Sequence, residues 1–319
     1  MADLKKRLAA LTLEKREALA KLLQERRATA RPAPQTVHAA AAESSLGEDL
    51  LMAMDDVPLE SAARKARWKR FYDTVSTQLD ENVFGQFSFF LNYGYVPDGE
   101  QEFSSVRLPE QYLNKNSVRL VLEVIQDCRV EGQQVLDVGC GRGGTIHVFK
   151  TFYKPARLVG LDLSTAAIQF CREAHKDPRV TFHEGDAENL PFDDGSFDIV
   201  TNLESSHTYP NIDRFYAEVF RVLAPGGYFL YTDMFPAEQV TTSIASLQQR
   251  GFDLERERDI TGNVLLSCDD VAKTRVQAFD DRNDGNMIET FLATPGSMAY
   301  EEMRTRRVSY RIFKLRKRN

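Results

Sequence analysis

A carboxylate, two hydroxyls and an imidazole lie close together in the stretch NLESSHTYP at residues 202–210. The stretch directly follows the apolar run FDIV (197–200), which is typical of a buried strand. A hydroxyl is a poor nucleophile at neutral pH, so a reaction at such an oxygen is helped by a base whose pKa lies near the operating pH. Histidine meets this condition without any perturbation. His207 is therefore a candidate general base, and proton transfer is the chemistry that the stretch predicts.

Two carboxylates are candidates for orienting the imidazole of His207. Glu204 precedes it by three residues, a spacing that places both side chains on one face if the chain turns helical after the strand. Asp233, in the run YTDMF at the end of a later apolar segment, is the alternative. A carboxylate in either place would raise the basicity of the ring and stabilise the imidazolium. The sequence does not choose between Glu204 and Asp233.

A glycine-rich run, VLDVGCGRGG at 135–144, lies between a predicted strand and a predicted helix. Its glycines allow the backbone to turn sharply and a ligand to lie against it, and the N–H groups of the following helix would face a negative or electron-rich group. Gly139, Gly141 and Gly144 match the G-x-G-x-x-G pattern of nicotinamide dinucleotide sites. This pattern alone is not specific, so the neighbouring acids decide the class of ligand.

Three acidic residues follow three successive predicted strands. Asp137, two residues before the first glycine, would take an ammonium group and repel a pyrophosphate. Asp162 in GLDLS is placed for the paired hydroxyls of a ribose, and Asp186 in GDAENLPF could accept the exocyclic amine of adenine. A ligand with an ammonium, a ribose and an adenine but no phosphate is S-adenosylmethionine. The residues expected to bind this cofactor are Asp137, Gly139, Cys140, Gly141, Asp162, Leu163, Asp186, Ala187 and Asn202.

Alternating strand and helix patterns after Gln134 would position these residues. Strands are predicted at 134–138, 157–162, 179–183, 197–202 and 227–234, with a sixth at 251–260 and a seventh at 308–315. Strands that alternate with helices indicate an α/β protein with a doubly wound, seven-stranded, mostly parallel sheet covered on both faces. The active sites of such sheets lie at the carboxyl ends of the strands, near the point where the strand order reverses. The fourth strand would deliver Glu204 and His207 to that edge.

The regions outside this core differ from it in composition. The predicted organisation is an amphipathic helical extension at 1–27, a linker at 28–58, a helical and aromatic lid region at 59–115, and a cofactor-binding core at 116–319 with a substrate lid insert near 283–303. An apolar helix face held off by a linker needs a surface to pack against, so 1–27 is also a candidate docking element. Trp68 recurs at helical spacing with other apolar residues and is expected in the core rather than at a ligand.

The ordered runs VLDVGCGRGG, GLDLS, GDAENLPF, FDIV and LAPGGYF (223–229) resemble the motifs of the seven-stranded S-adenosylmethionine-dependent methyltransferases. The resemblance covers roughly 130–235 and implies a Rossmann-like sheet whose final strand is reversed, in agreement with the periodic run at 308–315. It also implies cofactor roles for the three acids and their glycines. His207 would then accept the proton of the methylated hydroxyl.

Shorter resemblances indicate the class of molecule that accepts the methyl group. NLESSHTYP, together with FLNYGYVPD upstream, is similar to small-molecule methyltransferases that act on polyketide-derived, phenolic-lipid or glycolipid hydroxyls. Residues 8–27 resemble the leading segment of nonribosomal peptide synthetase modules. Together these resemblances imply an O-methyltransferase of a natural-product assembly line, acting on a free or carrier-bound polyketide-type acceptor. Assembly-line proteins would then be partners of 1–27.

Two other functions remain open at this point. NLESSHTYP is more distantly similar to sterol C-methyltransferases, in which Glu204 would stabilise a cation or take its proton from an alkene or enol carbon of a sterol- or polyene-like acceptor. A docking or scaffold module that binds the cofactor without turnover is the alternative of another class. The acids and histidines show no metal-ligand spacing, so a metal-independent reaction is expected.

The composition indicates the cellular compartment of the protein and excludes some classes of partner. The net charge of −6 speaks against broad nucleic-acid binding, which needs a basic face. The four cysteines form no C-x-x-C pair, a usage that suits a reducing cytoplasm. No apolar run approaches the ~18 residues of a membrane span, and the N-terminus lacks the features of an export signal. A cytoplasmic enzyme with a small-molecule acceptor is therefore expected.

Overall fold

The computed structural model describes residues 61–81, 88–99, 105–276 and 289–319, except for the side chains of 272–276. The expected helical extension at 1–27 and the linker at 28–58 lie outside the described residues, so the docking role of the extension stays a prediction. Parts of the expected lid regions at 59–115 and 283–303 also lie outside them.

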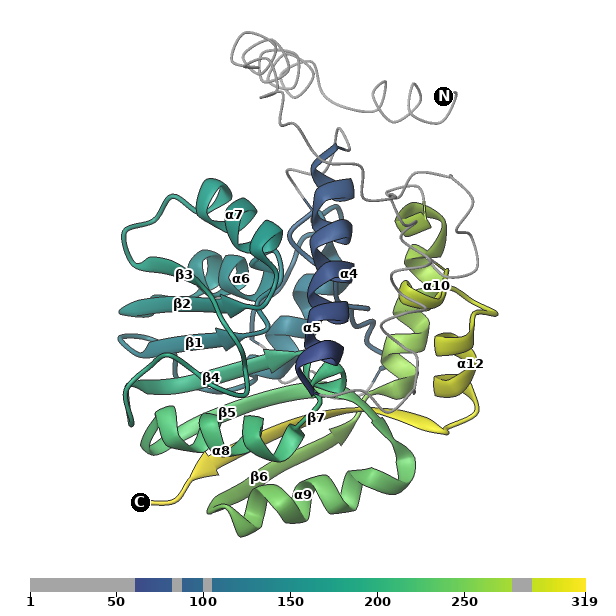
Figure 1. Cartoon of the computed structure of the whole chain (residues 1–319). Coiled ribbons are helices and arrows are strands. Elements are labelled where there is room, and N and C mark those ends of the chain that lie inside the picture. The colour runs from purple at the N-terminus through teal and green to yellow at the C-terminus, as the bar shows by residue number, and fades with distance from the viewer. Residues whose placement is uncertain (1–60, 82–87, 100–104, 277–288) are drawn as a thin grey trace, which may run out of the picture. The chain divides into compact units, whose positions relative to one another are not determined.

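A single seven-stranded sheet forms the centre of the fold (Figure 1). Its strands are β1 Gln134–Val138, β2 Arg157–Asp162, β3 Val180–Glu184, β4 Phe197–Leu203, β5 Leu223–Pro236, β6 Phe252–Asp259 and β7 Val308–Lys317. They lie in the order β3-β2-β1-β4-β5-β7-β6, and β7 runs antiparallel to both of its neighbours. The predicted doubly wound sheet with a reversed final strand is confirmed.

Helices cover both faces of this sheet. The core helices are α5 Lys115–Ile125, α6 Gly144–Phe152, α7 Thr165–Ala174, α8 Ile212–Val222 and α9 Val240–Gln249. One apolar core joins α5, α6 and α7 to the sheet, and a second joins α8 and α9 to the opposite face. Helices α4 Ser61–Glu81, α10 Thr261–Val276 and α12 Met298–Arg304 and the short 3₁₀ segments η2 Ser206–Thr208 and η3 Ala237–Gln239 complete the described elements.

Local sequence accounts for these elements. The central strand β1 is buried at every position after Gln134, as expected for a parallel strand covered on both faces. Helix α8 begins where the side chain of Asn211 accepts a hydrogen bond from the backbone N–H of Arg214, and it buries Phe215, Tyr216, Val219 and Val222 on one face. The apolar stripe of α8 therefore fixes which side of the helix meets the sheet.

The order of winding reverses between β1 and β4, which pair in parallel at the centre of the sheet. Loops that leave the carboxyl ends of these two strands turn to opposite sides and open a crevice there. Helix α4 crosses this edge of the sheet (Figure 1) and buries Phe71, Val75 and Leu79 in a small apolar cluster with Leu292. The fold thus places a helix from outside the alternating pattern over the predicted site.

Candidate active site

A cavity of about 430 Å³ lies at the carboxyl ends of β1 to β4, within the range of small-molecule sites of roughly 300–1,000 Å³. Its walls include Gly139, Cys140 and Gly141 after β1, Asp162 and Leu163 after β2, and Asp186 and Ala187 after β3. Glu204 and His207 line it after β4. Most of the residues predicted from sequence for the cofactor and for proton transfer therefore share one cavity.

The glycine-rich loop and Asp162 hold each other in place. Gly141 donates its backbone N–H to Oδ2 of Asp162 at 2.8 Å, and Ser164 donates to Oδ1 at 2.8 Å. A carboxylate has about four lone-pair sites, so each oxygen of Asp162 can still accept from a ligand hydroxyl. Burial raises the pKa of Asp162, although the two backbone N–H groups oppose this shift.

Two glycines of the loop are required by their surroundings. Gly139 has a φ of +70°, and a Cβ there would come within 2.0 Å of the Ser205 hydroxyl. Gly141 has a φ of +49°, and a Cβ there would meet only Leu91, at 3.8 Å. Because Gly141 and Leu91 both line the cavity, a side chain at position 141 would occupy space that the loop leaves open for a ligand.

Two of the expected cofactor residues lie behind the cavity wall. Asp137 is 1% exposed and accepts a hydrogen bond from the hydroxyl of Thr201 at 2.6 Å, and burial raises its pKa to about 7. Asn202 is completely buried and donates to the carbonyl of Val138 and the hydroxyl of Tyr209. Neither residue belongs to the described lining. Oδ2 of Asp137 and Oδ1 of Asn202 are buried without a hydrogen-bond partner among the described residues, so their expected contacts with the cofactor stay predictions.

The remaining wall fits S-adenosylmethionine. Asp162 and Asp186 present carboxylate oxygens to the cavity, and the loop leaves open the space at Gly141. Such acids can accept hydrogen bonds from ribose hydroxyls and from the amine of adenine, whereas they repel a pyrophosphate. These acceptor groups therefore suit a cationic nucleoside better than a dinucleotide.

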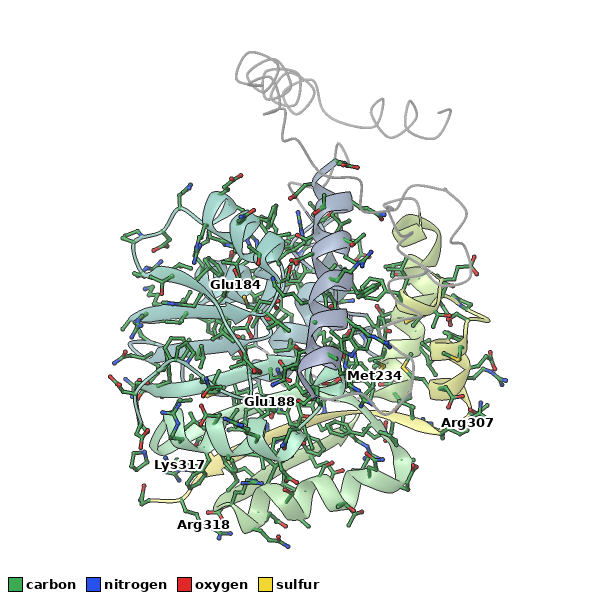
Figure 2. All side chains as sticks on the ribbon, viewed as in Figure 1. Glu184, Glu188, Met234, Arg307, Lys317 and Arg318 are labelled. Atoms are coloured by element: carbon green, nitrogen blue, oxygen red, sulfur yellow. The ribbon has the colours of Figure 1, made fainter. Side chains whose placement is uncertain are left out.

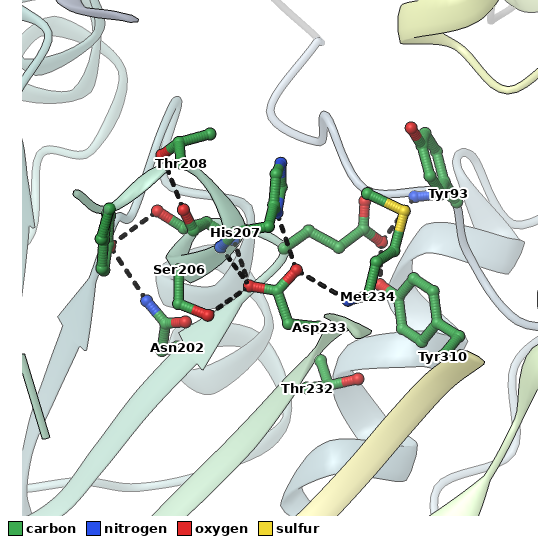
Figure 3. Close-up of polar contacts among 12 residues, drawn as sticks. Tyr93, Asn202, Ser206, His207, Thr208, Thr232, Asp233, Met234 and Tyr310 are labelled. Carbon is green, nitrogen blue, oxygen red and sulfur yellow. Dashed lines mark hydrogen bonds and ion pairs between the residues drawn. The ribbon is translucent and has the colours of Figure 1, made fainter. Parts of the chain in front are cut away.

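Asp233 is the hydrogen-bond partner of His207 (Figure 3). Nδ1 of His207 lies 2.7 Å from Oδ1 of Asp233, and the Asp233 side chain is fully buried. The His207 side chain is 27% exposed and lines the cavity. With Nδ1 held by the carboxylate, Nε2 at the opposite end of the ring is the nitrogen that can meet a substrate.

Asp233 accepts five hydrogen bonds. Oδ2 accepts from the backbone N–H groups of Ser205 and His207 and from the Ser206 hydroxyl, and Oδ1 accepts from the His207 ring and the backbone N–H of Met234. Such contacts favour the ionised carboxylate in a buried place. Backbone N–H groups at the start of η2 point toward Asp233. The end of β5 and the turn after β4 therefore position Asp233 and His207 together.

The pKa values of the pair are shifted in opposite directions. Burial lowers the pKa of His207, but the neighbouring Asp233 and Glu204 charges outweigh it and leave that pKa above 6.5. Burial raises the pKa of Asp233, but His207, Ser206 and Met234 outweigh it and leave that pKa below its usual value. Near neutral pH the aspartate is therefore charged, while the histidine can exchange a proton.

Glu204 has a different environment from the one expected. Its φ is +49°, so the chain is not helical at this residue and the expected helical spacing to His207 does not form. Its Oε1 accepts a hydrogen bond from the backbone N–H of Tyr93 at 2.8 Å and a short one from the Tyr310 hydroxyl. Of the two candidates, Asp233 therefore contacts the imidazole, and Glu204 connects the end of β4 to β7 and to the 88–99 segment.

Helix α4 contributes two lysine side chains to the cavity wall, and the sequence predicted no role for them. Lys65 pairs with Asp186 at 2.7 Å and with Glu188 at 2.6 Å, and Lys69 lies 3.3 Å from Glu184. Figure 2 labels Glu184 and Glu188 near the strand ends that α4 crosses. These pairs form because α4 packs with both lysines facing the acids after β3. The sequence does not predict which residues α4 faces.

Aromatic and apolar side chains form the rest of the wall. Trp68 and Tyr72 of α4 stack with 6.0 Å between their ring centroids and line the cavity, as do Tyr93, Phe291 and Met234. Trp68 also packs against Phe71. The expectation that Trp68 belongs to the core rather than to a ligand site is therefore only half right, because the same ring packs on a core residue and faces the cavity.

Among the residues that the structure describes, no group of three or more histidines, cysteines, aspartates and glutamates is arranged to hold a metal ion. No helix within the described ranges is both long and apolar enough to cross a membrane.

Comparisons with known proteins agree with this geometry. Residues 136–231 match the family described as Methyltransferase domain. The chain is 37% identical to a fatty-acid O-methyltransferase of Mycolicibacterium smegmatis over 84% of this chain and 97% of that protein. It is 38% identical to a phthiotriol/phenolphthiotriol dimycocerosates methyltransferase of Mycobacterium tuberculosis over 64% of this chain and 77% of that protein.

A solved structure supports the fold. The crystal structure of the cyclase SpnF matches with a TM-score of 0.60 and 22% identity, over 80% of this chain and 96% of that one. At this identity the likeness concerns the fold alone. The motifs, the cavity and the extent of the curated matches together carry the assignment: the chain belongs to the S-adenosylmethionine-dependent methyltransferases, and S-adenosylmethionine is its cofactor.

Proposed function

We propose that this enzyme is a metal-independent O-methyltransferase that methylates a neutral hydroxyl of an apolar small molecule, a lipid or a polyketide-type natural product, free or carrier-bound. The observation that carries the proposal is the pair formed by His207 and the buried Asp233, 2.7 Å apart at the cavity wall. A hydroxyl acceptor needs such a base, because its oxygen is protonated at neutral pH.

Each side chain has a defined task in this proposal. His207 accepts the acceptor's hydroxyl proton at Nε2, while Asp233 keeps the proton on Nδ1 and stabilises the imidazolium that forms. Asp162 and Asp186 bind the nucleoside, and the loop at Gly141 lies against it. When bound, S-adenosylmethionine supplies a methyl group on a sulfonium. The aromatic wall of Trp68 and Tyr72 excludes water and holds the apolar body of the acceptor.

The names of the relatives leave two acceptor groups to distinguish. A fatty acid offers a carboxylate oxygen, and a triol offers hydroxyl oxygens. A carboxylate is already ionised at neutral pH, so it needs no base, and Glu204 on the cavity wall would repel it. The acidic groups on the described wall therefore favour the hydroxyl, while esterification of a fatty acid is the second candidate, supported by the 37% identity.

The test uses acceptors matched in chain length, for example hexadecan-2-ol, a long-chain alkylphenol and hexadecanoic acid, with methyl-labelled S-adenosylmethionine. Mass spectrometry and NMR of the product identify the methylated atom as ether oxygen, ester oxygen or carbon. The proposal expects a methyl ether. A C-methylated product would instead support the sterol- or polyene-type alternative, and cofactor binding without turnover of any acceptor would support the scaffold alternative.

The variant His207→Gln sharpens this test. It should lower ether formation roughly 100-fold or more, the size expected for a lost general base, and leave cofactor binding unchanged. His183→Gln is the matched control, because His183 lies on β3 against Phe192 and outside the described cavity lining. Ester formation that survives His207→Gln, with no ether from either hydroxyl acceptor, would overturn the proposal in favour of a carboxylate acceptor.

A further inference from the structure

A chain of buried hydroxyl groups runs from Asp233 into the core between α8 and the sheet. The Ser206 hydroxyl lies 2.5 Å from Oδ2 of Asp233 and 2.5 Å from the hydroxyl of Tyr231, which lies 3.3 Å from that of Tyr216. These three hydroxyl-bearing residues are at most 4% exposed. Figure 3 shows the first link, from Ser206 to Asp233.

The surroundings of Tyr231 are aromatic and otherwise apolar. Its ring stacks on Phe229 with 4.8 Å between centroids and meets Phe235 and Phe313 edge-on or tilted. A phenylalanine would bury its ring in this cluster equally well, and a hydroxyl buried there is costly unless it is hydrogen-bonded. The hydroxyl of Tyr231 is therefore not explained by packing, but it is explained by its contact with Ser206.

The direction of the hydrogen bonds follows from Asp233. An ionised carboxylate only accepts, so Ser206 must donate its single hydroxyl proton to Asp233. Ser206 then accepts from Tyr231, which in turn accepts from Tyr216. Donors aligned in this way polarise one another in a buried environment. The positive ends of all three O–H groups consequently point toward the carboxylate.

We propose that Ser206 and Tyr231 are positioning residues for the methyl transfer: they hold Asp233 as an oriented anion and thereby set the pH at which His207 accepts a proton. This proposal rests on the base role of His207 given above. The other ionisable groups that face the pair are Glu204 after β4, Tyr72 of α4, Tyr209 after η2 and Tyr310 of β7. Burial raises the pKa of each of these tyrosines, so they remain neutral near pH 7.

The sign of the expected change follows from the field of the carboxylate. Removal of a donor from Oδ2 leaves more of the negative charge of Asp233 acting on His207, so the imidazolium is stabilised and its pKa rises. Ser206→Ala removes such a donor and should therefore move the acidic limb of the kcat/KM profile to higher pH by about half a unit, the effect of one hydrogen bond of ordinary net strength. Tyr231→Phe removes the donor that polarises the Ser206 hydroxyl and should move the limb in the same direction by less. The dissociation constant of S-adenosylmethionine should not change.

The experiment measures the kcat/KM pH profile and, independently of turnover, the ¹⁵N NMR titration of the His207 ring, assigned by its loss in His207→Gln. Ser206→Thr keeps the hydroxyl and should restore the wild-type titration. Phe229→Leu is the matched control, because it removes packing against Tyr231 but no hydroxyl, and should lower the melting temperature without moving the titration.

The two proposals fail in different ways. A His207 titration that is unmoved in both Ser206→Ala and Tyr231→Phe would overturn the positioning role while His207 remains the base. Full turnover by His207→Gln would overturn the base role, and with it any catalytic meaning of a shifted titration.

Discussion

The two halves of the cavity are built in different ways. The proposed cofactor half consists of three loops that each directly follow a parallel strand, and its hydrogen bonds join backbone N–H groups to carboxylates, such as Gly141 to Asp162. The proposed acceptor half combines the ends of β4 and β5 with Trp68 and Tyr72 of α4 and with lining residues at 89–93 and 290–299. The first half is a local property of strand–loop–helix units, whereas the second depends on how distant segments pack.

His207 and Asp233 lie where these halves meet. The backbone of η2 holds the pair from the sheet side, and the His207 ring faces the cavity. If the halves are functionally separate, changes in one should alter cofactor binding and changes in the other should alter turnover. The following predictions test this separation, beginning with the largest expected effect.

Asp233→Asn should lower kcat roughly 100-fold, within the range for general acid–base catalysis, and change the dissociation constant of the cofactor little. The amide cannot stabilise the imidazolium and can hold the ring in the wrong tautomer. Stopped turnover assays and calorimetric titration with S-adenosylmethionine measure both quantities. Asp253→Asn, at an exposed position of β6, is the control. A comparable loss of cofactor affinity would contradict the separation.

Asp162→Asn should weaken cofactor binding roughly tenfold or more, since a hydrogen bond to a charged group contributes about 1.5–3 kcal/mol. Turnover at saturating cofactor should change much less than in Asp233→Asn. Calorimetry and saturation kinetics give the two values. If kcat falls as far as the affinity, Asp162 also shapes the acceptor half and the boundary between the halves is drawn wrongly.

The pH dependence should differ between the halves. His207 must be neutral to accept a proton and its pKa is raised above 6.5, so kcat/KM should fall about tenfold for each pH unit below that pKa. The pKa of Asp233 is lowered, so this carboxylate stays charged through the same range. Burial raises the pKa of Asp137 to about 7, so cofactor affinity should also weaken as the pH falls through neutrality.

The variant Asp137→Asn separates these two titrations. Cofactor affinity measured against pH should become flat in this variant, while the acidic limb of kcat for the saturated enzyme should persist. An unchanged pH dependence of affinity would mean that Asp137 does not influence the cofactor half through its charge.

Lys65→Met should have the smallest effect on turnover, less than about threefold, because the ion pairs of Lys65 are with Asp186 and Glu188 after β3 and not with His207 or Asp233. Glu188 is 3% exposed, so the loss of its partner should instead lower the melting temperature by about 2–4 °C. Differential scanning fluorimetry compares it with Lys154→Met at an exposed position. A large loss of cofactor affinity would place α4 in the cofactor half itself.

Sequence patterns predicted the sheet and most of the cofactor half. The apolar runs gave all seven strands within a few residues, and Asp162 and Asp186 line the cavity as expected. Asp137 and Asn202 are buried outside the cavity lining, and the sequence did not predict this because it depends on which way a strand residue points near its carboxyl end. Side chains alternate along a strand, and in a sheet covered on both faces the pattern does not reveal which face meets the ligand.

Which carboxylate contacts His207 depends on the register between β4 and β5. Thr232 of β5 pairs with Leu203 of β4, which brings Asp233 beside the turn that follows β4. Glu204 is nearer in sequence, but its positive φ turns its side chain toward Tyr93 and Tyr310. A pattern of residue types predicts neither the register between two strands nor which residue adopts a left-handed backbone conformation.

The sequence alone determined the doubly wound sheet, the acids Asp162 and Asp186 at the cavity wall and the histidine after the fourth strand, because each is encoded within one strand–loop–helix unit. Only the tertiary structure decided that Asp233 contacts His207 and that Ser206 and Tyr231 extend the hydrogen-bond chain from Asp233. It also decided that α4 lines the cavity with Trp68, Tyr72 and Lys65. These contacts join residues far apart in the chain, and packing of whole elements brings them within hydrogen-bond distance.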